Sequence, residues 1–327
     1  MSCYHPLIGI WKGDYTDSGK KKYEIHGNLD PTDCPSVYDK IVIPCGHCIG
    51  CRLDYSRSWA DRMMLELETA GCGIFVTLTY DNVHIHWSSF DENGDPEWNT
   101  LDKRDFQLFM KRLRREFDGS GDLPFKKIRF YAAGEYGSNT HRSHMHCILF
   151  GLNVSDFPDI KPHGKNELGQ LFYSSERFAR IWSNGFCLIS DVSWKTCAYV
   201  ARYVTKKLNG DAAMDYAVRN CIPEFALMSR KPGLGREYLD KHPECLDYEK
   251  INLSTSEGGL EIRLPKYYLK QLKLTDPDRY DKIMEQRKQL ANDSMLLQLQ
   301  NTNLSYLEYL EVKENQKLNC VKSLKRE

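Results

Sequence analysis

The sequence predicts an α+β fold in which helices cover one face of a central, largely antiparallel β-sheet. Four short apolar segments bounded by Gly, Asp or Ser have the composition of strands. Two of them are separated by the short polar loop GSNTHR, which is typical of a hairpin, and segments with helical periodicity lie between and around the strands.

The strands are expected at residues 73–80, 127–136, 144–152 and 185–192. Helices are expected at residues 53–69, 102–117, 174–182 and 194–208. In the second of these helices Asp102 can cap the N-terminus. Its apolar residues recur at helical spacing, at Phe106, Phe109, Met110, Leu113 and Phe117.

The periodicity weakens after about residue 232, where turn-forming residues are frequent. The tail from residue 277 fits a Gln- and Asn-containing helix with poor caps. We therefore expect an N-terminal segment (1–55), a core domain (56–240) and a largely helical C-terminal extension (241–327).

Composition excludes several classes of protein. The 327 residues, 41% hydrophobic and 28% charged, are typical of a globular chain. Lys plus Arg and Asp plus Glu each number 45, and this balance argues against a generic polyanion binder. No apolar run reaches the roughly 18 residues of a membrane span, and the N-terminus lacks the pattern of a signal peptide. We expect a cytoplasmic protein without a membrane partner.

Strand alternation places His144 and His146 on the same face of the strand 144–152. If the preceding strand pairs with it as a hairpin, Glu135 lies almost opposite His144 on that face. Two imidazoles and one carboxylate can hold a divalent ion and leave positions open for substrate oxygen. His84 and His86 have the same spacing, but they lie in an acidic, aromatic segment, and we interpret them as a feature of a surface loop.

Tyr199 and Tyr203 lie four residues apart on the expected helix 194–208 and so share one face, with Lys206 and Lys207 following. A phenol is a poor nucleophile near neutral pH, but a nearby cation stabilises the phenolate. The alternative is that the two tyrosines form the packed face of an amphipathic helix.

Cys45, Cys48 and Cys51 have a regular spacing that suits one metal ion, and Cys3 is the best candidate for a fourth thiolate. Structural Zn²⁺ is favoured over an iron–sulfur cluster, because Tyr55 occupies the position where a ferredoxin-like motif has cysteine. A reduced, metal-free cluster is the other possibility. The other candidates for the fourth ligand are His47, Cys34 and His5.

Glu, His-x-His and YxxxYxxK, in this order after the strand FVTLTY, resemble the motifs of HUH endonucleases that initiate rolling-circle replication. The blocks MSCYHPL, PCGHCIGCRLDYSRSWADR, FVTLTYDN, DKRDFQLFMKRLRR, GEYG, HRSHMHCILFG, AYVARYVTKK and EFALMSRKPGLGREYL together resemble the replication initiators of gokushoviruses, small circular single-stranded DNA phages of the Microviridae. These blocks extend from residue 1 to about residue 239, and the tail beyond residue 265 resembles the family only loosely.

The resemblance implies an HUH catalytic domain with a ferredoxin-like core. It implies that Tyr199 and Tyr203 attack a phosphodiester at the origin, which leaves a 5′-phosphotyrosine and a free 3′-hydroxyl, and that the strand is later rejoined. Lys206 matches the motif lysine, and His144 and His146 match the metal-binding pair. The implied ion is Mg²⁺ or Mn²⁺, and the strand argument adds Glu135 as its third ligand.

The implied partners are phage origin DNA and, in the cytoplasm of the bacterial host, a helicase, a DNA polymerase and a single-strand binding protein. The helicase must be separate, because the chain has no GxxxxGK[ST] motif. Two alternatives remain: a plasmid-type initiator or transposase of the HUH class, and a non-enzymatic single-stranded DNA binding protein that uses aromatic residues of the sheet.

Overall fold

A computed structural model describes residues 3–27, 29–31, 39–137, 139–166, 169–203, 211–255 and 258–323. The chain divides into two compact units. One comprises residues 1–55 and 269–327, and the other comprises residues 56–268. The expected core domain, 56–240, lies within the second unit.

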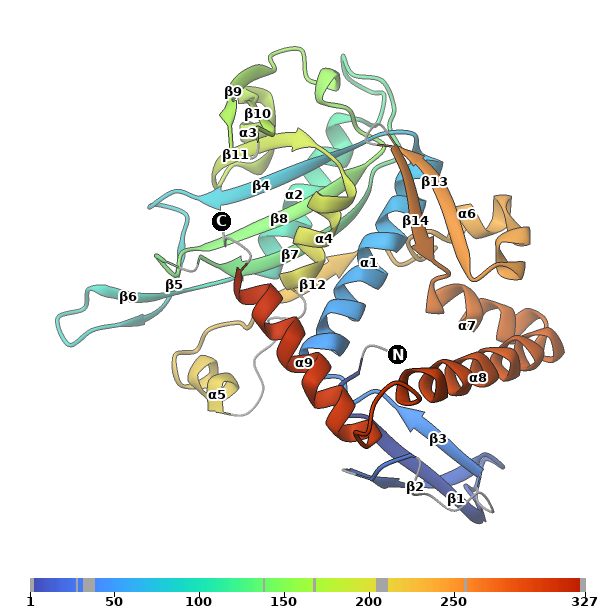
Figure 1. Ribbon diagram of the computed structural model, residues 1–327. Coiled ribbons are helices and arrows are strands. Elements are labelled where there is room, and N and C mark those ends of the chain that lie inside the picture. The colour runs from blue at the N-terminus through green and yellow to red at the C-terminus, as the bar shows by residue number, and fades with distance from the viewer. Residues whose placement is uncertain are drawn as a thin grey trace. The chain divides into compact units, whose positions relative to one another are not determined.

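A seven-stranded sheet forms the centre of the unit 56–268, with strand order β12-β7-β8-β4-β11-β10-β9 (Figure 1). Every pair of neighbouring strands is antiparallel, as the sequence predicts. In that order the strands are β12 (Phe225–Met228), β7 (Arg129–Tyr136), β8 (Ser143–Phe150), β4 (Gly73–Tyr80), β11 (Gly185–Asp191), β10 (Leu171–Ser174) and β9 (Lys161–Lys165).

Helices cover both faces of this sheet, so the prediction that they lie on one face is wrong. The helices α2 (Lys103–Glu116) and α3 (Glu176–Trp182) pack on one face, and α4 (Trp194–Tyr203) packs on the other against β7 and β8 (Figure 1). The helix α1 (Ile49–Ala70) also contacts this second face, where the ring centroids of Trp59 and Tyr131 lie 5.2 Å apart.

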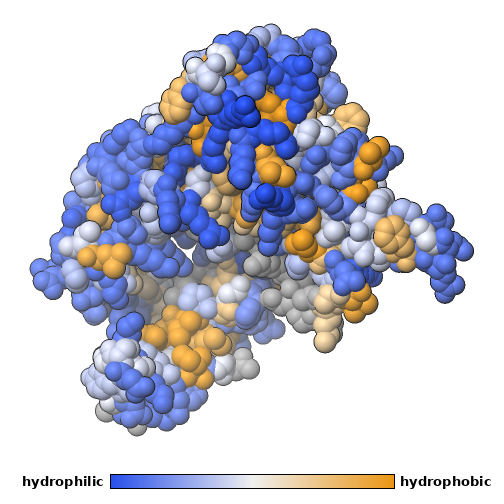
Figure 2. Space-filling view, turned by 180° about the vertical axis from the view of Figure 1, so that it is seen from behind, coloured by the Kyte–Doolittle hydropathy of each residue, from blue (hydrophilic) through white to orange (hydrophobic). Residues whose placement is uncertain are grey.

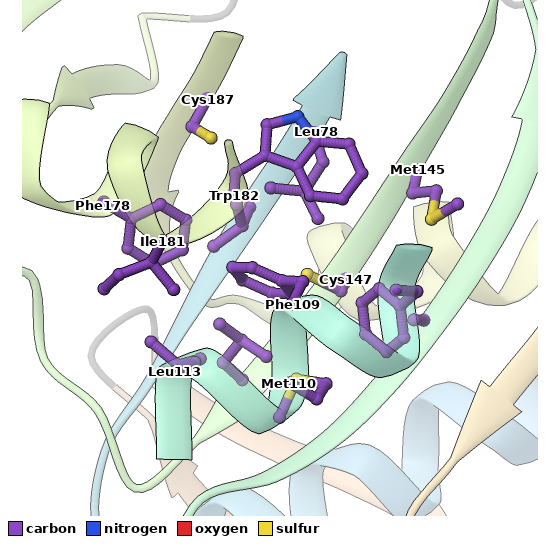
Figure 3. Packing of buried hydrophobic residues seen from close by; sticks show 14 of the residues in the cluster. Leu78, Phe109, Met110, Leu113, Met145, Cys147, Phe178, Ile181, Trp182 and Cys187 are labelled. Carbon is purple, nitrogen blue, oxygen red and sulfur yellow. The ribbon is translucent and has the colours of Figure 1, made fainter. Parts of the chain in front are cut away.

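The main hydrophobic core lies between the sheet and α2 and α3. In Figure 3, Phe109, Met110 and Leu113 of α2 face Trp182 of α3 and Cys147 of β8. Strand alternation sends every second residue of β4 and β8 into this core and leaves the intervening residues for the opposite face. This alternation directs the polar residues of the site to one side of the sheet.

The helix predicted at 102–117 is confirmed, since Asp102 accepts a hydrogen bond from the Arg104 amide and caps α2. The four predicted strands are confirmed within two residues at each end. Other elements of this unit were not expected: the hairpin of β5 (His86–Phe90) and β6 (Pro96–Thr100), the hairpin of β13 (Lys250–Thr255) and β14 (Gly258–Arg263), and the helices α5 (Asp211–Val218) and α6 (Arg236–Lys241).

The other unit holds a three-stranded antiparallel sheet of order β2-β1-β3, which the sequence analysis missed. Its strands are β1 (Leu7–Tyr15), β2 (Lys21–His26) and β3 (Asp39–Ile43), and its helices are α8 (Pro277–Leu299) and α9 (Tyr306–Ser323). The helix α7 (Lys266–Thr275) begins at the boundary between the units.

The expectation of one poorly capped helix from residue 277 is wrong. The tail forms two helices, and the Asp276 carboxylate accepts a hydrogen bond from the Arg279 amide at 3.0 Å to cap α8.

Within the described ranges, no helix combines the length and apolar character needed to cross a membrane. The surface in Figure 2 is mostly hydrophilic, and its hydrophobic residues form separate small patches.

Candidate active site

Three side chains of the β7–β8 hairpin converge on one point. The register pairs Glu135 directly with His144, as predicted from the hairpin. The Oε1 atom of Glu135 lies 2.8 Å from Nε2 of His144 and 3.0 Å from Nε2 of His146. Glu135 and His146 are buried, whereas His144 is partly exposed, so the group opens to solvent on one side.

The far ring nitrogen of each histidine also has a partner. Nδ1 of His144 lies 3.0 Å from the carbonyl oxygen of Arg142, and only a protonated Nδ1 can donate to that acceptor. Nδ1 of His146 lies 2.9 Å from the Thr77 hydroxyl on β4. Because a second partner fixes ring orientation in this way at metal-binding histidines, the Nε2 lone pairs are positioned to coordinate an ion.

The charge of Glu135 is stabilised by its neighbours. Burial acts to raise the pKa of this carboxyl, but hydrogen bonds from His144 and His146 outweigh burial and hold the pKa well below its usual range. Glu135 is therefore an anion near neutral pH. A carboxylate and two imidazoles whose ligand atoms all lie within 4.8 Å of one another fit a single divalent ion.

Tyr199 on α4 packs directly on this group. Its ring centroid lies 5.1 Å from that of His146, with the planes at 76°, and 6.2 Å from that of Phe75. The guanidinium carbon of Arg202 lies 5.5 Å from the Tyr199 ring centroid. The phenol therefore has a predicted metal ligand on one side and a cation nearby.

The other predicted residues of this helix are described less fully. Tyr203 is the last residue of α4, and its side chain is outside the described part of the structure. Lys206 and Lys207 lie outside the described residues.

The second histidine pair does not form a shared site, but the prediction of a loop is wrong for His86. His86 begins the strand β5, where its Nε2 lies 2.7 Å from Oδ2 of Asp105, while His84 pairs with Asp81. The strand escaped notice because β5 is short and partly exposed, so it lacks an apolar alternation.

Comparison with known proteins gives the family. The family model for the Replication-associated protein ORF2 matches residues 73–208, a range that includes the converging group and the YxxxYxxK segment. The Replication-associated protein ORF2 of Spiroplasma virus 4 is 29% identical over 339 residues, covering 100% of this chain and 98% of that protein. The Replication-associated protein VP4 of Bdellovibrio phage phiMH2K is 31% identical over 259 residues, covering 76% of this chain and 75% of that protein.

This chain belongs to the microvirus replication-associated proteins. The Replication-associated protein ORF4 of Chlamydia phage 1 is a further relative, 27% identical over 277 residues, covering 82% of this chain and 63% of that protein. No solved structure matches the chain significantly.

This microvirus replication-associated protein also brings four cysteines together. The ligand atoms of Cys3, Cys45, Cys48 and Cys51 lie within 4.8 Å of one another. The Sγ atoms of Cys45 and Cys51 are 4.0 Å apart, as are those of Cys3 and Cys48. A tetrahedral zinc site with Zn–S bonds of about 2.3 Å separates its sulfurs by about 3.8 Å, so the four thiols fit one ion.

Backbone amides support the sulfur atoms. The amides of Cys45, Cys48 and Cys51 donate to Sγ of Cys3, Cys45 and Cys48 at 3.3 to 3.4 Å. Burial raises the pKa of the Cys3 thiol to about 11. At Cys45 burial acts in the same direction, but amide hydrogen bonds outweigh it and lower the pKa.

The alternative fourth ligands fall away from this cluster. His5 pairs instead with Glu314 at 2.6 Å, and the His47 side chain is exposed. Cys34 is outside the described residues.

Sequence reasoning missed three contributors to the site of this replication-associated protein. Thr77 orients His146, Phe75 stacks on the His146 ring with centroids 5.6 Å apart, and Arg202 lies beside Tyr199. The signal for Thr77 was present: it is a polar residue at an alternate position of an apolar strand.

Proposed function

We propose that this protein is the endonuclease and strand transferase that nicks the origin of a circular single-stranded DNA phage genome and so initiates rolling-circle replication. The observation that carries the proposal is the packing of Tyr199 against a group of one carboxylate and two imidazoles on a single face of the sheet. A phenol beside such a group is the arrangement that nucleophilic attack on a phosphodiester requires. Family membership supports a role in replication.

In the proposed reaction the Tyr199 hydroxyl oxygen forms a bond to the scissile phosphorus and loses its proton. The bond from phosphorus to the 3′ oxygen breaks, and that oxygen takes up a proton to become the free 3′-hydroxyl. The products are a 5′-phosphotyrosine and a primer end. Because one phosphodiester replaces another, the reverse attack by a 3′-hydroxyl can rejoin the strand without a nucleotide cofactor.

Glu135, His144 and His146 would hold the divalent ion, Mg²⁺ or Mn²⁺. Bound there, such an ion supplies Lewis-acid polarisation of a phosphate oxygen. The chain's own contribution is positional. Thr77 and the Arg142 carbonyl fix the two imidazoles, and Phe75 supports the His146 ring.

We assign Tyr203 as the second nucleophile, which would cleave the regenerated origin while Tyr199 holds the first 5′ end. Lys206 is assigned as the cation that stabilises the phenolate or the phosphate. Arg202, beside the Tyr199 ring, supports the idea of positive charge at this helix.

We further propose structural Zn²⁺ at Cys3, Cys45, Cys48 and Cys51, since the sulfur spacing suits a tetrahedral thiolate site. The proposed partners are origin DNA and, in the host cytoplasm, a helicase, a polymerase and a single-strand binding protein.

The decisive experiment incubates the purified full-length protein, with Mg²⁺ or Mn²⁺, with a labelled single-stranded oligonucleotide that carries the phage origin. We expect a covalent protein–DNA adduct that survives denaturing electrophoresis. The double variant Tyr199→Phe, Tyr203→Phe should form none. An adduct formed equally well by that variant would refute the proposed function.

A further inference from the structure

Phe186 is an exposed aromatic residue in the central sheet. Its side chain is 71% exposed, although it lies in the interior strand β11. The residues that follow at Cys187 and Ile189 point into the core formed with α2 and α3. Strand alternation therefore places Phe186 on the opposite face, which is the face that carries Glu135, His144 and His146.

The strand register puts Phe186 in one row with the candidate active site. Phe186 pairs with Thr79 of β4, Thr79 pairs with His144 of β8, and His144 pairs with Glu135 of β7. Directly paired residues in antiparallel strands project from the same face. Because neighbouring strands lie about 4.8 Å apart, the backbones of Phe186 and His144 are separated by about 10 Å.

The surroundings of Phe186 leave its ring open and hold its backbone in place. The helix α4 packs on β7 and β8, and the neighbours of Phe186 on its own face, Thr79 and Leu188, are only partly buried. The Thr79 hydroxyl donates to the Phe186 carbonyl at 3.1 Å. Gly185 has φ +147°, and a side chain there would collide with the backbone of β4.

Phe186 also borders an open hollow of about 440 Å³. Arg180 and Ser183, which line this hollow, can donate hydrogen bonds to a phosphate or to a base edge. Isolated exposed apolar residues are common, so exposure alone carries no weight. The alignment with the histidine row and the adjacent cation together distinguish Phe186.

We propose that Phe186 is a stacking platform for one base of single-stranded DNA whose phosphate backbone crosses the sheet toward Glu135, His144 and His146. Aromatic side chains beside positive charge bind single strands in this way, because every base has a π-face. The inference rests on the proposed function, since it assigns DNA as the occupant of this face.

The test measures binding of the full-length protein to a fluorescein-labelled, unstructured single-stranded oligonucleotide, with no added divalent ion. A second oligonucleotide of equal length, made of abasic sugars, has the same phosphates but no bases. We expect Phe186→Ala to weaken binding of the intact strand by about fivefold to 150-fold, and binding of the abasic strand by less than about twofold. Phe186→Trp should bind the intact strand as tightly as the unmodified protein.

Phe125, which is 70% exposed and lies outside this row, provides the matched control, and Phe125→Ala should leave both affinities unchanged. Equal weakening of both strands by Phe186→Ala, or no weakening of either, would overturn the proposal. Adduct formation is measured separately. If the unmodified protein forms no adduct, the proposed nuclease function fails, while the two binding curves still decide whether Phe186 stacks on a base.

Discussion

The ring of Tyr199 stands edge-on to the ring of His146, with centroids 5.1 Å apart and planes at 76°. The two residues are far apart in the sequence and come from different elements, α4 and β8. Their contact joins the two motifs that the sequence presents separately. The helix that carries the tyrosines therefore packs on the sheet face that carries the histidines.

This contact predicts that Tyr199 is the nucleophile of the first cleavage. Removing its hydroxyl leaves the packing of the ring unchanged but abolishes the attacking atom, so Tyr199→Phe should lower first-cleavage adduct by more than about a thousandfold. Mass spectrometry of the trapped adduct should place the DNA on Tyr199. A Tyr199→Phe protein that forms a normal amount of adduct on Tyr203 would contradict this assignment.

A second prediction concerns Thr77, whose hydroxyl contacts Nδ1 of His146 at 2.9 Å. Thr77→Val keeps the shape of the side chain and removes the partner that orients the imidazole. Loss of such a partner costs about 10-fold to 100-fold in metal affinity, so adduct formation should require correspondingly more Mn²⁺.

Thr79→Val is the matched control, because Thr79 lies on the same strand and face but bonds to the Phe186 carbonyl. Its Mn²⁺ requirement should match that of the unmodified protein. Equal Mn²⁺ requirements for the Thr77 and Thr79 variants would show that Thr77 does not position the ligand.

A third prediction concerns the core on the other face of the sheet. Phe109 is fully buried and packs against Phe178 and Trp182, with ring centroids 5.6 and 5.9 Å apart. Phe109→Ala should lower the free energy of unfolding by about 3 to 5 kcal/mol, because it removes buried apolar surface and leaves a cavity. Chemical denaturation measures the loss. Exposed Phe125→Ala should change stability by less than about 0.5 kcal/mol, and similar losses in both variants would contradict the assigned core.

The part of the site that the sequence predicts well is local. Glu135 and His144 lie on two strands joined by a short loop, so the period-two alternation and the loop length together set their register. The position of Tyr199 is different, since a helical pattern identifies its apolar face but not the sheet face on which it packs. This is why both the covering of two faces and the contact with His146 emerged only from the structure.

The three-stranded N-terminal sheet was missed for another reason. The strand β2 is largely exposed and polar, and residues such as Lys22 and Glu24 carry no apolar alternation. Its strands are defined by pairing with β1 rather than by their own pattern. The cysteine cluster was predictable because three of its members lie close together in the sequence, whereas Cys3 required a guess about the chain path that the structure supports.

The cysteine cluster gives a prediction for pH. In the metal-free protein, burial raises the pKa of Cys3 to about 11, so this thiol is protonated at neutral pH. Zinc binding must displace that proton, and the apparent affinity for Zn²⁺ should therefore rise with pH below this pKa, by about tenfold per unit for each proton released. Competition with a chromophoric chelator between pH 6 and 8 measures the slope. Cys3→Ser should weaken binding and reduce the slope, whereas Cys320→Ser, at an exposed cysteine outside the cluster, should leave both unchanged. An affinity that does not vary with pH, or that is unaffected by Cys3→Ser, would exclude thiolate coordination by Cys3.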